Sequence, residues 1–198
     1  MGAELLGVSC GNEIHQRAHV ASVVQKIQHR VGLIAKMGAL HAASAFSTLR
    51  LCGAFPSVNY FMRCNGSSPH LHLLSLHTRA AFETIVGPMT DVAWLQAQLP
   101  IRLGGCGLRN PATFSSAAYV ASSAAAAHLL GQFTELHLAP LPLLQLEARS
   151  ESLANNRSVQ DIVLPVLEGL VAAQKLQKKI SLFIDDAAAA SQHRLDAN

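Results

Sequence analysis

Hydrophobic residues recur at every third or fourth position over long stretches of this chain, the spacing that places them along one side of an α-helix. The longest such pattern predicts a helix from Glu13 to Met37. Its apolar stripe consists of Val20, Val23, Val24, Ile27, Val31 and Ile34. Most of the basic residues of this segment fall outside the stripe, so we expect an amphipathic helix with a basic, solvent-facing side.

Proline, glycine and capping residues predict where the other helices begin and end. We expect helices from His41 to about Phe55, stopped by Pro56; from Pro69 to Val86, capped by Ser68; a short one after Thr90; from Pro111 to Leu130; and from about Pro165 to Ser191. Residues 57–68 are interpreted as a connection between two of these helices. The predicted fold class is therefore all-α, a helical bundle.

One segment departs from the helical pattern, the stretch LPIRLGGCGLRNP at positions 99–111. Leu99, Ile101 and Leu103 alternate with other residues, which predicts a short extended segment with one apolar face. Pro100 lies within that segment, and Leu108 returns to the apolar side. Gly104, Gly105 and Gly107 allow a tight reversal, because only glycine enters positive φ at little cost. Asn110 and Pro111 then predict the start of a helix.

Composition shifts predict three units along the chain. We expect a helical domain over residues 1–138, a linker rich in proline and polar residues over 139–164, and a long C-terminal helix over 165–198. Half of the residues are hydrophobic and 14% are charged, which supplies enough apolar side chains for a core. The scarcity of aromatic residues, at 5%, favours closely packed helices over a β-sandwich.

Cysteine usage and the N-terminus bear on where the protein works. Four cysteines lie far apart and form no CxxC pair, so we interpret them as free thiols. The first ten residues contain Glu4 and no basic segment, so they do not resemble a secretory signal. The uncharged run after Pro111 consists largely of alanine, serine and polar residues, which contribute too little transfer free energy for a membrane span. We expect an intracellular protein, cytoplasmic or nuclear, without a membrane partner.

The sequence offers weak candidates for catalysis or metal binding. Asp185 and Asp186 follow an aromatic residue and an isoleucine, as in the Mg²⁺-binding box of polymerases, but their neighbours are typical of a helix, which favours acidic residues on a helix surface. His15 and His19 have a spacing that can bind a metal, without an obvious third ligand. No nucleophile–base motif indicates a stand-alone hydrolase. We therefore predict no catalytic residue and no metal site.

Basic residues are the stronger candidates for function. Arg17, Lys26, Arg30 and Lys36 lie on the first long helix, and Arg102 and Arg109 flank the glycine turn. Such side chains could contact the phosphates of a nucleic acid. The formal net charge of +3 is low, so the alternative remains open that they form a solvated helix face and anchor a loop.

The same segments resemble the C-terminal part of reverse transcriptases of non-LTR retroelements. The glycine motif followed by an alanine-rich helix is similar to their LPxRxGGLGLRS…APAAYxAS pattern, and ELLGVSCGNE at 4–13 resembles xLLGxPxG. FSTLRLCGAFPSVNYFMR at 46–63 is similar to LLLRxCxxPRLNYLLR, and LQKKISLFIDDAAA at 176–189 to xQxxLSxxIDxAA. Cys106 stands where the family usually has leucine, and Asn110 where it has serine or threonine.

This resemblance implies the end of the palm followed by a helical thumb and connection, which in that family grips the template–primer duplex. It adds Arg50 and Arg63 to the candidate contacts to RNA or an RNA–DNA duplex. The catalytic palm and fingers, with the carboxylates that hold Mg²⁺, have no counterpart in this chain, so we expect a truncated fragment that is inert alone and needs no cofactor of its own. The alternative is a non-catalytic protein-interaction or structural domain, with self-association as its expected signature.

Overall fold

The computed structural model describes residues 2–5, 8–66, 68–130 and 176–196. An antiparallel hairpin of β1 (Gly2–Leu5) and β2 (Val8–Gly11) precedes the first helix, with Leu5 opposite Val8. The helices are α1 (Glu13–Met37), α2 (Ala42–Cys52), α3 (Ala54–Asn65), α4 (His70–Val86), α5 (Asp91–Gln98), α6 (Pro111–Leu130) and α9 (Leu176–Asp196). The predicted all-α helical bundle is confirmed, and the small hairpin is an addition that the sequence pattern did not predict.

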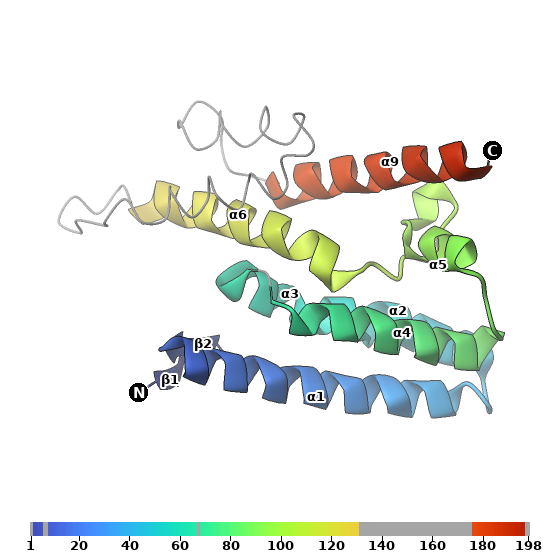
Figure 1. Cartoon of the computed structure of the whole chain (residues 1–198), viewed down its shortest axis with the longest axis horizontal. Coiled ribbons are helices and arrows are strands. Elements are labelled where there is room, and N and C mark those ends of the chain that lie inside the picture. Colours follow the sequence, from blue (N-terminus) through green and yellow to red (C-terminus); the bar gives the residue numbers. More distant parts are fainter. Residues whose placement is uncertain (1, 6–7, 67, 131–175, 197–198) are drawn as a thin grey trace.

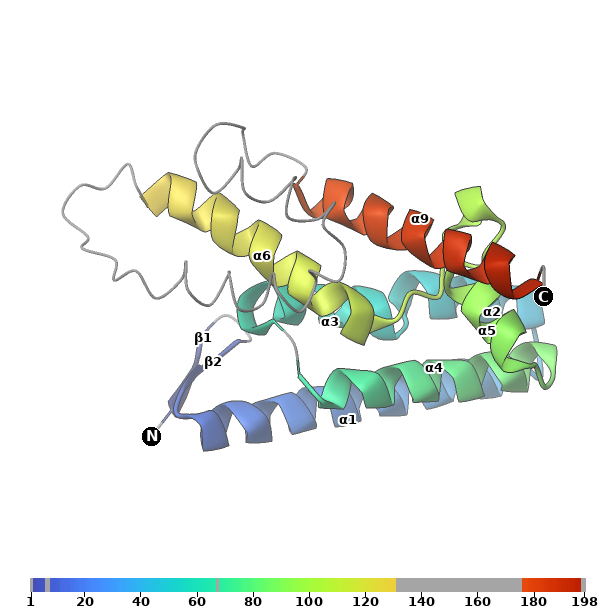
Figure 2. The same cartoon turned by 45° about the horizontal axis from the view of Figure 1, so that its top comes forward.

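The helices lie in successive layers (Figure 1). Helix α1 forms one outer edge and packs against α4 and α2. Helix α6 packs against α3 and α4, and α9 in turn packs against α6 and α5. The turned view in Figure 2 likewise places α1 and α9 at opposite sides of the molecule. Any site on the outer face of α1 is therefore well separated from one between α5 and α9.

Helix α1 has the predicted bounds and the predicted buried stripe. The Asn12 side chain caps its start, because Oδ1 accepts a hydrogen bond from the His15 N–H at 3.0 Å. Along the stripe, Val23 is half-buried and the other predicted members are buried. Val31, for example, is only 2% exposed. The 3.6-residue period of the helix thus separates the core side of α1 from its solvent side.

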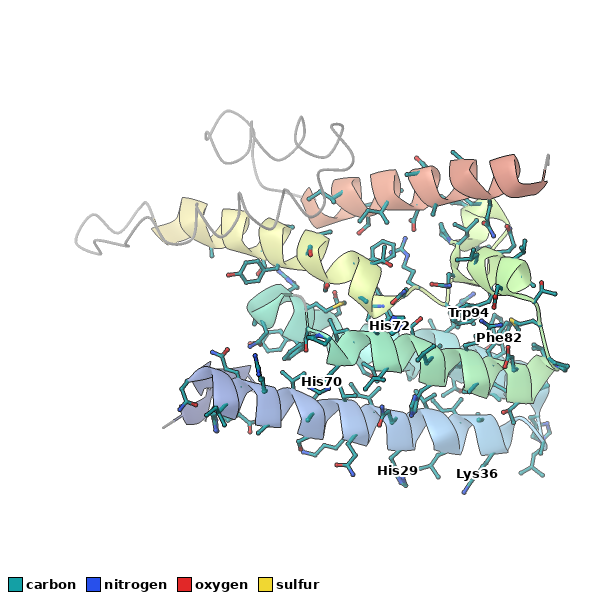
Figure 3. The ribbon with its side chains drawn as sticks, viewed as in Figure 1. His29, Lys36, His70, His72, Phe82 and Trp94 are labelled. Atoms are coloured by element: carbon teal, nitrogen blue, oxygen red, sulfur yellow. The ribbon has the colours of Figure 1, made fainter. Side chains whose placement is uncertain are left out.

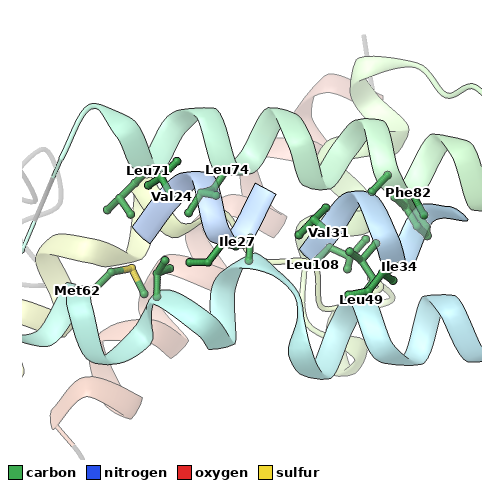
Figure 4. Packing of buried hydrophobic residues seen from close by; sticks show 14 of the residues in the cluster. Val24, Ile27, Val31, Ile34, Leu49, Met62, Leu71, Leu74, Phe82 and Leu108 are labelled. Atoms are coloured by element: carbon green, nitrogen blue, oxygen red, sulfur yellow. The ribbon is translucent and has the colours of Figure 1, made fainter. Parts of the chain in front are cut away.

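The main core lies between α1, α4 and the pair α2–α3 (Figure 4). Leu71 and Leu74 of α4, Leu49 of α2 and Met62 of α3 are buried against the stripe of α1. At the other end of α4, the rings of Phe82 and Trp94 lie with centroids 6.4 Å apart, which joins α5 to the same core (Figure 3). Truncating one such side chain to alanine costs about 2–5 kcal/mol of stability.

The prediction that Pro56 stops a helix is wrong, as is the connection predicted over residues 57–68. Pro56 lies in the first turn of α3, where a missing N–H breaks no intrahelical hydrogen bond. The break between α2 and α3 lies at Gly53, where a Cβ would come within 2.1 Å of the Leu49 carbonyl oxygen. Because no side chain fits there, glycine rather than proline sets the boundary.

Of the other predicted helix boundaries, some agree with the structure and some do not. The Thr90 hydroxyl caps α5 as expected, accepting from the Ala93 N–H at 3.2 Å. Ser68 does not cap α4 with its side chain; its carbonyl instead accepts from the Leu71 N–H. Helix α9 continues past the predicted end at Ser191 to Asp196. The predicted linker 139–164, its two boundaries and the helix start at Pro165 lie outside the described residues.

No helix in the described part of the chain is both long enough and apolar enough to cross a bilayer.

Candidate nucleic-acid interface

The glycine motif is not the extended segment that the alternation of apolar residues predicts. Leu99 and Pro100 are extended, but Ile101–Leu103 form one turn of 3₁₀-helix. Leu99 is 5% exposed, whereas Ile101 is 61% exposed, so the two side chains do not share a face. The Pro100 carbonyl accepts from the Leu103 N–H at 2.9 Å and from the Gly105 N–H at 3.2 Å, which tightens the chain into a turn.

Glycine is required at the three positions of this motif for different structural reasons. Gly104 and Gly107 both have a φ of 75°, a conformation that is costly for residues with a side chain. Gly105 is required for space, because a Cβ there would lie 2.0 Å from the Leu99 carbonyl oxygen. The Gly107 N–H donates to that same oxygen at 2.8 Å, so the loop folds back on the end of α5.

After the turn, the chain enters α6 as the sequence predicts. Leu108 is buried in the main core, and its N–H donates to the Ala97 carbonyl of α5. The Asn110 Oδ1 accepts from the Ala112 N–H at 3.0 Å, and Pro111 is the first residue of the helix. The loop is therefore fixed at both ends, which determines where its two arginines lie.

Arg102 and Arg109 both contact the acidic pair on α9. Arg109 Nη2 donates to Asp185 Oδ2, and Arg102 Nη2 donates to Asp186 Oδ1 at 2.9 Å. The Arg109 guanidinium also lies over the Phe114 ring, 5.0 Å from its centroid, and 5.9 Å from that of Phe55. Two arginines face two carboxylates here, so these guanidinium groups are compensated within the protein and anchor the loop to α9.

The sequence predicts that both acidic residues lie on a helix surface, but only Asp186 does. The Asp186 side chain is 60% exposed, but that of Asp185 is only 2% exposed. Burial raises the pKa of the Asp185 carboxyl above its usual value, and the nearby charges of Arg109 and Arg102 oppose that shift. The helical placement of both residues fits the prediction that they do not form the tip of a catalytic hairpin.

Two further candidates lie apart from the acidic pair. Arg50 of α2 is half-buried, and its aliphatic stem lies beside Gly107, where a Cβ would come within 3.4 Å of Arg50 Cδ. Arg63 is exposed in the last turn of α3. Arg50 thus packs against the glycine loop, whereas Arg63 lies on another helix, where its charge acts on the neighbouring Tyr60.

Helix α1 brings Lys26, Arg30 and Lys36 together on its outer side. All three are exposed, and at 3.6 residues per turn they fall within about a third of the helix circumference. His29 lies between them, and Figure 3 shows His29 and Lys36 pointing away from the bundle. A shallow depression on this side is lined by Ser22, Gln25, Lys26, His29, Arg30 and Leu33. Arg17 is also exposed, but it lies about half a turn around the helix from Lys26.

One contact from another helix orients this face. Arg30 Nη1 donates to the Ser57 hydroxyl of α3 at 3.1 Å, and that hydroxyl donates to the Cys52 carbonyl at 3.2 Å. The guanidinium is therefore held by one of its N–H groups, with others left to face a ligand. Sequence reasoning missed both His29 and Ser57, and the 27-residue separation of Arg30 from Ser57 offers no local signal.

The charge of the chain is concentrated on this helix. Within its bounds α1 has four basic residues and a single acidic one, Glu13, at its first position. That excess equals the formal net charge of the whole chain, +3, so the remainder is formally neutral. A positive potential is accordingly centred on the outer face of α1.

The chain matches no protein-family model, no curated protein and no solved structure.

Proposed function

We propose that this chain binds the phosphate backbone of duplex RNA or of an RNA–DNA hybrid through Lys26, Arg30 and Lys36 on the outer face of α1. The concentration of the net positive charge on that one exposed helix face is the observation that carries the proposal. The resemblance to the thumb and connection of retroelement reverse transcriptases suggests the same partner. Template–primer gripping within a larger polymerase is the role that this resemblance favours.

Binding through this face does not distinguish between sequences. Lysine and arginine neutralise phosphates and release condensed counterions, which supplies affinity without base readout. His29 and Leu33 border the depression, and no phenylalanine, tyrosine or tryptophan stands among its lining residues as a platform for stacking a base. We therefore expect weak binding that falls steeply with salt.

The proposal assigns no catalysis to this chain alone. Phosphoryl transfer by the two-metal route needs carboxylates that are free to hold Mg²⁺. Asp185 and Asp186 are instead each paired with an arginine of the glycine loop. Any polymerase activity would require the carboxylates of a palm domain.

Fluorescence anisotropy with a labelled RNA–DNA hybrid over a series of KCl concentrations tests the proposal. Three phosphate contacts predict a slope of log Kobs against log salt of about −3. The variant K26Q should reduce the magnitude of that slope by about 1. The matched control K178Q removes the same charge from an exposed site on α9, and should change the slope much less.

Two results would contradict the proposal: no saturable binding at low salt, or equal losses of affinity in K26Q and K178Q. Equal losses would show that only net charge matters. Absence of binding would favour the alternative function, a non-catalytic protein-interaction or structural domain. Sedimentation velocity over a range of protein concentrations then tests for self-association.

A further inference from the structure

His29 lies on the outer face of α1, among the side chains proposed to contact phosphates. It lines the same shallow depression as Lys26 and Arg30. Its side chain is exposed and points away from the bundle, as does that of Lys36 (Figure 3). At 3.6 residues per turn, His29 falls between Lys26 and Lys36 both along the helix and around its axis. A phosphate strand that contacts both lysines therefore passes beside the imidazole.

The described residues that line this depression include no carboxylate. Apart from the imidazole, the lining groups are cationic or uncharged: Ser22, Gln25, Lys26, Arg30 and Leu33. Within α1 the one acidic residue, Glu13, lies about four turns before His29. Glu4 of β1 lies 3.6 Å from His19, about three turns away from His29. The part of the chain that the structure describes thus places no anion beside the imidazole.

The elements packed against α1, namely β2, α2, α3 and α4, do not change this picture. Strand β2 has no charged residue, and the charged residues of α2 and α3 are Arg50 and Arg63. Helix α4 has three histidines, and its one carboxylate, Glu83, pairs with Arg79 at 2.9 Å. Among the described residues only those of α1 line the depression, and the Ser57 hydroxyl of α3 reaches it through Arg30. An anion beside His29 must therefore come from a ligand.

We infer that His29 makes duplex binding dependent on pH, because its imidazole takes up a proton from solvent when a backbone phosphate occupies the depression. The inference rests on the proposed function, since it concerns the regulation of the same face. A phosphate oxygen close to the ring favours the charged form of an imidazole. Histidine is the side chain that ordinarily changes its charge between pH 5 and pH 8, so the face gains a fourth cation as the solution becomes mildly acidic.

One added phosphate contact has an effect of predictable size. With four cations rather than three on the phosphates, the slope of log Kobs against log salt should change from about −3 to about −4. Each contact contributes about 0.9 to the magnitude of that slope, which corresponds to about an eight-fold gain in affinity at 0.1 M salt.

Anisotropy titrations of the labelled RNA–DNA hybrid at pH 5.8 and pH 8.0 test the inference on the full chain. The unsubstituted chain should bind several-fold more tightly at pH 5.8, with the steeper salt slope. His29→Gln introduces a polar side chain that does not titrate, so its slope should stay at about −3 at both pH values. The matched control His72→Gln removes an exposed histidine from α4 and should retain the full pH dependence.

A permanently charged variant and a count of protons complete the test. His29→Lys should bind at pH 8.0 as tightly as the unsubstituted chain binds at pH 5.8. Isothermal calorimetry at pH 7 in buffers of different ionisation enthalpy measures the protons taken up on binding. We expect uptake of part of one proton per bound chain, retained in His72→Gln and lost in both His29 variants. Circular dichroism at each pH verifies that the variants are folded.

Equal pH dependence of affinity in His29→Gln and in the unsubstituted chain would overturn the inference, and so would equal proton uptake in these two proteins. If K26Q still weakens binding at pH 8.0 in that case, the proposed function stands and the role of His29 alone is refuted. If the hybrid binds at neither pH, the proposed function fails and the inference fails with it.

Discussion

Arg109 donates a hydrogen bond to Asp185 and so joins two segments that lie 76 positions apart in the chain. Arg109 ends the glycine loop just before α6, and Asp185 lies midway along α9. The guanidinium also covers the Phe114 ring, so it fills the junction between the two helices. The arginine that the sequence offered as a phosphate contact thus has a structural role within the fold.

Replacing Arg109 with methionine tests that role. Asp185 is 2% exposed, so removing its closest partner leaves a buried charge with only the longer 3.8 Å contact to Arg102, and we expect a loss of about 3 kcal/mol in unfolding free energy. Arg102→Met removes the more exposed pair with Asp186 and should cost under about 1 kcal/mol. Urea denaturation at neutral pH measures both values.

A double-mutant cycle separates the ion pair from simple packing. In the Asp185→Asn background there is no buried charge to compensate, so Arg109→Met should cost at least about 1 kcal/mol less there than in the unsubstituted chain. Equal costs in the two backgrounds would mean that Arg109 acts through its contacts with the aromatic rings alone.

The pH dependence of stability follows from the same carboxyl. Burial raises the pKa of Asp185 in the folded state, so the folded chain holds this proton more tightly than the unfolded chain. The stabilisation is complete below the ordinary aspartate pKa of about 4 and is lost as pH rises through the folded-state value. Relative to Asp185→Asn, the unsubstituted chain should lose stability from pH 3 to pH 7. A relative gain would show that the two arginines outweigh burial.

Thiol reactivity provides a check on the glycine loop. Burial raises the pKa of the Cys106 thiol, whereas Cys52 and Cys64 are exposed. Because the thiolate is the reactive form, iodoacetamide at pH 8 should modify Cys106 several-fold more slowly than Cys52 and Cys64. Mass spectrometry of tryptic peptides measures the three rates. In urea the difference should vanish, and an equal rate in the folded chain would contradict the burial of this loop.

Local sequence patterns predicted those helices whose position is determined by residues close together in the chain. The apolar period of α1 and the Asn110–Pro111 start of α6 are determined within a few residues, and both were placed correctly. Pro56 misled because proline is compatible with the first turn of a helix as well as with its end. Ile101 misled because a 3₁₀ turn, rather than a strand, follows Pro100.

The candidate site depended on contacts that no local pattern contains. Arg102 and Arg109 are separated from their carboxylates by 84 and 76 positions, so their pairing could not be read from the motif. Gln192 meets Val92 across 100 positions, and its unpartnered oxygen is visible only in the folded chain. The basic side of α1, by contrast, followed from helical periodicity alone.

Substitution of the two adjacent glycines in the loop should have different effects. In Gly105→Ala the new Cβ would lie 2.0 Å from the Leu99 carbonyl oxygen and 2.7 Å from that of Gln96, both backbone atoms that cannot rotate away. We expect a loss of about 3 kcal/mol or more in unfolding free energy, typical of a forced backbone shift in a packed region. In Gly104→Ala the new Cβ meets only the flexible end of the Gln96 side chain, at 3.3 Å. Its cost should therefore be about 1–2 kcal/mol, that of a left-handed backbone conformation. Urea denaturation of the two variants ranks them, and the reverse order would mean that φ, rather than space, restricts this loop to glycine.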